Sequence, residues 1–146
     1  MRMLLLLLLP GFALAGGPET ALAGKNATLR DASGKTQSIA THAGATTTYR
    51  DASGRLSATA TRSAGGSITF RDASGRLTGS AAASGATTAC RDASGRLTAT
   101  ATTSSSGVTT YRDSSGRLTG TSTQQGGTIT FRDAQGRLTG TAKVKK

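Results

Sequence analysis

The chain has 146 residues and carries 18 Lys and Arg against 7 Asp and Glu, a formal net charge of +11 at pH 7. Three Phe, two Tyr and no Trp exclude a large aromatic core, and the basic excess favours anionic partners such as polysaccharide, lipid headgroups or extracellular nucleic acid. The same excess would also keep a sheet protein with little core soluble, so charge alone selects no ligand.

Residues 1–15 have the layout of a cleaved secretory signal. A short basic start is followed by an apolar run, residues 4–9, which is too short to span a bilayer, and by the small-residue site at residues 13–15. A second Ala-x-Ala site at residues 21–23 leaves the cleavage position open. We expect an exported protein, secreted, periplasmic or on the cell surface, with residues 16–27 as a flexible segment.

A sixfold repeat occupies residues 28–142 and is followed by a basic tail, residues 143–146. An Arg-Asp pair recurs at spacings of 20, 21, 20, 21 and 20 residues, and a fixed period of this length indicates stacked or arrayed units. The alternating spacing predicts two kinds of distal loop. The first unit, with Lys35 and Thr36 in place of Arg-Leu, and the last unit are atypical, as capping units are.

Each unit contains Asp-x-x-Gly, which is typical of a tight β-turn. The Asp accepts hydrogen bonds from backbone N–H groups within the turn, and the Gly supplies the positive φ that closes the hairpin. No segment has a helical period, so we predict an all-β chain. The structural turn residues are Asp31, Asp51, Asp72, Asp92, Asp113 and Asp133 with Gly34, Gly54, Gly75, Gly95, Gly116 and Gly136.

The alternation of side chains along each strand assigns an inner and an outer face. In the stretch ITFRDASGRLTGS, a four-residue loop would pair Arg71 with Arg76 and Phe70 with Leu77. Phe70, Leu77 and Gly79 would then lie inside, with Arg and Thr outside. A three-residue loop would place Phe70 and Leu77 on opposite faces, and we reject it for that reason.

A single hairpin cannot be stable with so few apolar residues. Two large apolar side chains per unit contribute about 2 kcal/mol each when buried, whereas ordering each residue costs roughly 1.5 kcal/mol. The units must therefore bury their inner faces against one another, with small residues such as Gly79 allowing close approach. The sequence predicts six tandem antiparallel β-hairpins, stacked as a solenoid-like array or joined as an extended meander sheet.

The repeat resembles two known families. Residues 126–140 (GGTITFRDAQGRLTG) and 45–56 (ATTTYRDASGRL) are similar to the YD repeats of Rhs-type proteins, although here an Arg stands between the aromatic residue and Asp. The spacing aromatic-x-Asp-x-x-Gly-x-Leu also resembles variant MORN-type hairpin repeats. Both resemblances imply antiparallel sheet built from successive hairpins. The toxin-carrying role of the large Rhs proteins does not transfer, because the chain has no room for such a domain.

No motif indicates catalysis, a metal or a cofactor, and we expect a non-enzymatic protein without a small-molecule substrate. His42 is the only His, and a triad or metal site needs converging partners that the repeat lacks. One Asp per unit does not supply the six to eight oxygens that calcium takes. Cys90 stands where other units have an aromatic residue, so we interpret it as buried; in an oxidising compartment it could instead link two chains.

The outward Arg residues are the best functional candidates. Two per unit would form a double basic ladder along the tight-turn edge, which suits a linear polyanion. The alternative is that the Arg residues bracket each Asp to hold the turn and prevent edge pairing. The candidate polyanion-binding residues are Arg50, Arg55, Arg71, Arg76, Arg91, Arg96, Arg112, Arg117, Arg132 and Arg137.

These features favour a structural or surface-interaction module of the cell envelope. Adhesion to anionic polymers through the Arg ladder is the alternative, and self-association is a further option. Outward Thr-x-Thr rows, as at Thr59 and Thr61, would also suit an ice-binding face. Strand–turn repeats with few aromatic residues would also suit an extracellular cross-β fibre.

Overall fold

A computed structural model describes residues 23–145, so the expected signal peptide and most of the flexible segment lie outside the described residues. This part of the chain forms twelve β-strands. The strands are β1 (Asn26–Asp31), β2 (Thr36–Ala43), β3 (Thr46–Asp51), β4 (Leu56–Arg62), β5 (Ile68–Asp72), β6 (Leu77–Ser84), β7 (Thr87–Asp92), β8 (Leu97–Thr103), β9 (Val108–Asp113), β10 (Leu118–Gln125), β11 (Thr128–Asp133) and β12 (Leu138–Lys145).

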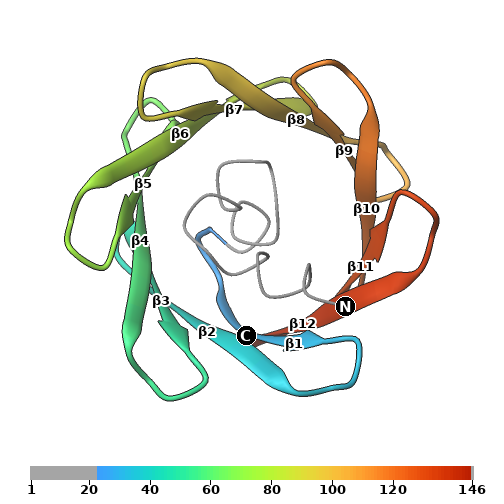
Figure 1. Cartoon of the computed structure of the whole chain (residues 1–146), viewed down its shortest axis with the longest axis horizontal. Helices are drawn as coiled ribbons and strands as arrows, with labels where there is room; N and C mark the ends of the chain where they lie inside the picture. Colours follow the sequence, from blue (N-terminus) through green and yellow to red (C-terminus); the bar gives the residue numbers. More distant parts are fainter. Residues whose placement is uncertain (1–22, 146) are drawn as a thin grey trace.

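The strands form one closed antiparallel barrel (Figure 1). Each strand pairs with its neighbours in sequence, and β1 pairs with β12 over six residue pairs, from Asn26 with Lys145 to Asp31 with Gly140. The prediction of an all-β chain of antiparallel hairpins is confirmed. The solenoid-like array and the open meander sheet are wrong, because the first and last units pair with each other instead of capping two free ends.

The cross-strand register explains why the sheet closes. The partner of Ala40 in β3 is Tyr49, and the partner of Tyr49 in β4 is Ala58. The residue of β4 that is equivalent to Ala40 of β2 is Ala60, which lies two residues beyond Ala58. Each hairpin is therefore displaced by two residues relative to the hairpin before it. Six such displacements of two give a shear of twelve residues, equal to the number of strands. Equal shear and strand number corresponds to a strand tilt of about 36°, and barrel closure requires such a stagger.

The tight turns contain three-residue loops, so the predicted four-residue loop is wrong. The backbone N–H of Asp72 donates to the carbonyl of Arg76 at 3.0 Å, which leaves residues 73–75 as the loop. The N–H of Gly75 donates to the carbonyl of Asp72 at 3.0 Å, and Gly75 has a φ of 84°. A type I turn followed by a left-handed Gly is a common three-residue hairpin connection.

The exposed Leu residues follow from this loop. Arg71 pairs with Leu77 and Phe70 pairs with Gly79, so a β-bulge at Thr78 separates the two pairs. Phe70 and Gly79 therefore face inward, while Leu77 lies beside Arg71 on the outer face. The predicted pairing of Phe70 with Leu77 is wrong. Thr78 is an extra residue in β6, so the first inward-facing residue after the turn is Gly79 and not Leu77. The outward Leu residues, 38–41% exposed, are Leu56, Leu77, Leu97, Leu118 and Leu138.

The inner face alternates large and small residues around the barrel. Phe70 lies between Ala60 and Gly79, and Tyr49 lies between Ala40 and Ala58. Such alternation fits large side chains into the interior of a barrel. The buried large position is filled in turn by Leu29, Tyr49, Phe70, Cys90, Tyr111 and Phe131.

All six tight turns lie at one end of the barrel, because each connects an odd-numbered strand to the next even-numbered strand. The distal turns lie at the other end, where β1 begins and β12 ends (Figure 1). The distal turns alternate as expected between two kinds, represented by Gly44 with a φ of 59° and Gly66 with a φ of 84°. The barrel extends beyond residues 28–142 at both ends, since β1 begins at Asn26 and β12 ends at Lys145.

Candidate functional site: a basic crown

Barrel closure converts the predicted Arg ladder into a ring. Twelve exposed cations surround the tight-turn end, and we call this set the basic crown. Six turn Asp residues lie among the twelve cations, which leaves a formal charge of +6 at this end. The crown consists of a first row, Arg30, Arg50, Arg71, Arg91, Arg112 and Arg132, and a second row, Lys35, Arg55, Arg76, Arg96, Arg117 and Arg137.

Each turn Asp organises its own loop. Oδ1 of Asp72 accepts hydrogen bonds from the backbone N–H and the hydroxyl of Ser74, at 2.9 and 2.6 Å, and from the backbone N–H of Arg76 at 3.0 Å. The same contacts recur at Asp51. The carboxylate therefore binds the loop backbone, and its role is local.

The first-row Arg residues also serve the turns. Nη1 of Arg71 donates to the carbonyl oxygen of Gly75 at 2.9 Å. Each of the other five first-row residues makes the same contact with the Gly of its own turn, at 2.9–3.0 Å. The expectation that Arg holds the turn therefore applies to the first row, but through the Gly carbonyl and not through the Asp carboxylate.

The second row is different. Within residues 23–145 the one ion pair is between Arg137 Nε and Asp133 Oδ2 at 2.8 Å, and the Arg137 side chain is still 77% exposed. Arg55, Arg76 and the equivalent residues contribute their backbone N–H to the turn, while their guanidinium groups lie exposed. These groups remain accessible to an external anion.

The electrostatics of the turns follow from these bonds. Hydrogen bonds from the Ser53 side chain, and next from the backbone N–H of Arg55, hold the pKa of Asp51 below its ordinary value. Asp72 and Asp113 have lowered pKa values for the same first cause, a Ser hydroxyl bond. These three carboxylates are therefore ionised at neutral pH and keep the loop bonds in place.

The remaining candidate residues lie elsewhere. His42 lies in the distal half of β2, where Nδ1 is 3.2 Å from Thr47 Oγ1 and the backbone N–H donates to Asn26 Oδ1. Cys90 is completely buried on the inner face, as its place in the repeat predicts. Within residues 23–145, no group of three or more His, Cys, Asp or Glu residues could hold a metal ion. None of the described segments forms a helix that could cross a membrane.

Comparison with known proteins adds no family. No protein-family model matches the sequence, and no curated protein matches it either. Function must therefore be inferred from the geometry of the barrel.

Sequence reasoning missed part of the crown. Arg30 and Lys35 occupy the first-row and second-row positions of the first hairpin but were not among the candidate residues. The repeat period alone would have found both. The outward Leu residues gave no comparable signal, because their position depends on the bulge.

Proposed function

We propose that the chain is an exported, non-enzymatic surface-interaction module that binds anionic polymers or an anionic cell-envelope surface through the basic crown. The observation that carries the proposal is the second row, whose cations are exposed at one end of a closed barrel while their backbones complete the turns. The fold requires the backbone of these residues and leaves their charge available.

The chemistry of the crown favours recognition of charge alone. Guanidinium groups bind phosphate, sulfate and carboxylate through paired N–H donors. The aromatic side chains of the barrel, such as Tyr49 and Phe70, are buried on the inner face, so no aromatic platform is available at the crown for stacking on bases. A polyanion would therefore be bound through its charged groups, with affinity that falls steeply with salt.

The ring geometry changes the expected ligand arrangement. Neighbouring strands lie about 4.8 Å apart, which places successive tight turns roughly 10 Å apart around the barrel. A straight polymer can contact only part of such a ring. A flexible polyanion that crosses the barrel end, or a surface with many anionic groups, would contact more of it.

A structural role without a ligand is the second candidate, because the first row already acts within the turns. The cross-β fibre and the ice-binding face lose support from the fold. A cross-β fibre needs free sheet edges, and the described strands have none because the barrel is closed. An ice-binding face should be flat, whereas Thr59 and Thr61 lie on a curved wall.

The proposal can be tested by measuring binding to a sulfated polysaccharide and to duplex DNA across a range of salt concentrations. We expect logarithmic affinity to fall linearly with logarithmic salt concentration. The triple variant R55Q/R76Q/R96Q should bind at least tenfold more weakly at low salt, and its slope on DNA should be smaller by about 2–3, since each lost phosphate contact removes about 0.9.

The matched control is R62Q/K143Q/K145Q, which removes the same charge at the distal end. It should retain most of the affinity and the slope. Equal losses in the two triple variants would show that net charge, and not the crown, causes binding. Absence of binding at low salt would reject polyanion recognition and leave the structural role.

A further inference from the structure

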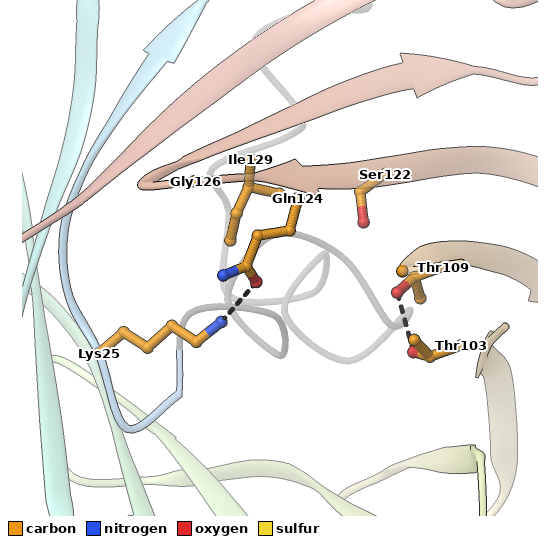
Figure 2. Close-up of a pocket in the computed structure, with 8 residues that line it drawn as sticks. Lys25, Thr103, Thr109, Ser122, Gln124, Gly126 and Ile129 are labelled. Carbon is orange, nitrogen blue, oxygen red and sulfur yellow. Dashed lines mark hydrogen bonds between the residues drawn. The ribbon is translucent and has the colours of Figure 1, made fainter. Parts of the chain in front are cut away.

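The distal end of the barrel, opposite the basic crown, contains a pocket lined by polar side chains (Figure 2). Its volume is about 460 Å³, and small-molecule sites typically occupy about 300–1,000 Å³. The lining combines hydroxyl, amide and ammonium groups with a single large apolar residue. The described lining residues are Lys25, Thr103, Gly107, Thr109, Ser122, Gln124, Gly126 and Ile129.

The deep side of the pocket is well ordered by packing and hydrogen bonding. Ser122 is 4% exposed, and its hydroxyl lies 2.9 Å from the hydroxyl of Tyr111 in the buried aromatic layer. Ile129 is also buried on the inner face and lies beside Gln124, its cross-strand partner, as an apolar part of the wall (Figure 2). These residues provide a fixed surface with one hydroxyl and one apolar patch.

The outer part of the pocket carries groups that can exchange partners. Thr103 and Thr109 hydroxyls are 2.9 Å apart, and Lys25 Nζ donates to Gln124 Oε1 at 3.2 Å (Figure 2). A Lys ammonium has three donors, and a hydroxyl both donates and accepts. A ligand can therefore bind to Lys25, Thr103 and Thr109 without breaking the strand pairing.

The charge of this region is positive. Lys25 is the charged side chain among the described lining residues, and all six described carboxylates belong to the tight turns at the opposite end. Lys25 also lines an adjoining hollow with His42 and Arg62. An anionic group entering the barrel mouth therefore meets cations and no described carboxylate.

We propose that this pocket binds a sugar acid, a polyhydroxylated ring that carries one carboxylate. Lys25 binds the carboxylate in a charge-assisted hydrogen bond. The hydroxyls of Thr109 and Ser122 and the amide of Gln124 bind the ring hydroxyls, and Ile129 contacts the apolar face of the ring. One cation among several neutral polar groups suits one carboxylate on a polyol better than it suits a simple multivalent anion. This site is independent of the crown, because it lies at the opposite end of the barrel.

The test is a titration of the isotope-labelled full chain with D-glucuronate, followed by two-dimensional amide NMR. We expect saturable shifts of the Gly107, Gln124 and Gly126 amides, with no matching shifts at the tight turns. D-glucose, which lacks the carboxylate, should bind at least tenfold more weakly. Thr109→Val removes one hydroxyl at similar volume and should weaken glucuronate binding severalfold.

The matched variants are Lys25→Gln and Lys143→Gln, which remove the same charge. Lys143 is exposed on the outer wall of β12. Lys25→Gln should weaken glucuronate binding at least tenfold, whereas Lys143→Gln should change it less than twofold. The amide spectrum outside the pocket and the melting temperature check that both variants are folded. Equal effects of the two variants, equal affinity for inorganic sulfate, or no saturable shift at the pocket would overturn the proposal.

Discussion

Phe70 and Leu77 are large apolar residues of the same hairpin, yet they lie on opposite faces of the barrel wall. Phe70 is 1% exposed on the inner face, whereas Leu77 is 39% exposed on the outer face next to Arg71. The inner face is determined by packing, since each large residue needs small neighbours on both sides. The outer face is determined by the turn and its bulge, which leave side chains there available for contacts with other molecules.

Truncating Phe70 and Leu77 should give the largest difference in stability between the inner and the outer face. Phe70→Ala removes a fully buried ring and should lower the free energy of unfolding by about 3–5 kcal/mol. Leu77→Ala should change it by less than about 1 kcal/mol, because the side chain is already partly in water. Denaturant unfolding measures both. Similar losses in the two variants would mean that Leu77 is buried and that the register is the one predicted from the sequence.

A second pair of variants compares a tight turn with a distal loop. Gly75 has a φ of 84°, so Gly75→Ala should be strained and should destabilise the barrel by about 1–2 kcal/mol. At Gly65 φ is not positive, and an added Cβ would meet only the Ser63 hydroxyl at 3.9 Å. Gly65→Ala should therefore be neutral or slightly stabilising, through a less flexible unfolded chain. Thermal melting gives both values, and a neutral Gly75→Ala would contradict the turn geometry.

Low pH should weaken the hydrogen bonds of the tight turns but not the packing on the inner face. The lowered pKa values of Asp51, Asp72 and Asp113 mean that these carboxylates stabilise the folded state above the pKa of about 3.9 for an unfolded Asp. This contribution is lost as pH falls below that value and through the lowered folded pKa. A pH series of melting curves should show stability constant near neutrality and declining below about pH 4. The decline should be smaller in Asp51→Asn, whereas an unchanged decline would argue against the Asp51 bonds.

The smallest effect should distinguish the two Arg rows. Arg71→Gln loses the bond to the Gly75 carbonyl and should lower the free energy of unfolding by up to about 1 kcal/mol. Arg76→Gln loses no hydrogen bond from its side chain in the described structure and should stay within about 0.5 kcal/mol of the parent. Equal losses in denaturant unfolding would show that both rows serve the fold, which would weaken the case for binding by the second row.

Much of the local structure could be predicted from the sequence. The period, the Asp-x-x-Gly turns and the absence of helical patterning indicate an all-β chain of antiparallel hairpins, and the barrel contains them. The alternation of side chains along the strand could not reveal the bulge at Thr78. Because Thr78 is an extra residue, Leu77 lies on the outer face and not on the inner face with Phe70. Grouping the apolar residues on one face then favoured the wrong loop.

Closure could not be predicted for a related reason. It depends on a displacement of two residues per hairpin, which becomes visible only when partners such as Ala40, Tyr49 and Ala58 are known. The crown forms a ring only because the barrel is closed. The distal pocket gave no signal at all, because Lys25 and Gln124 are 99 positions apart in the sequence and meet only across the barrel.

Pairing of β1 with β12 is the central claim, since the ring of cations and the distal mouth both require it. The most direct measurement is the set of backbone nuclear Overhauser contacts in the isotope-labelled protein. We expect contacts between Thr28 and Lys143 and between Arg30 and Thr141, as strong as those of the other eleven strand pairs. Contacts for the eleven pairs without any between β1 and β12 would show an open sheet and contradict the closed barrel.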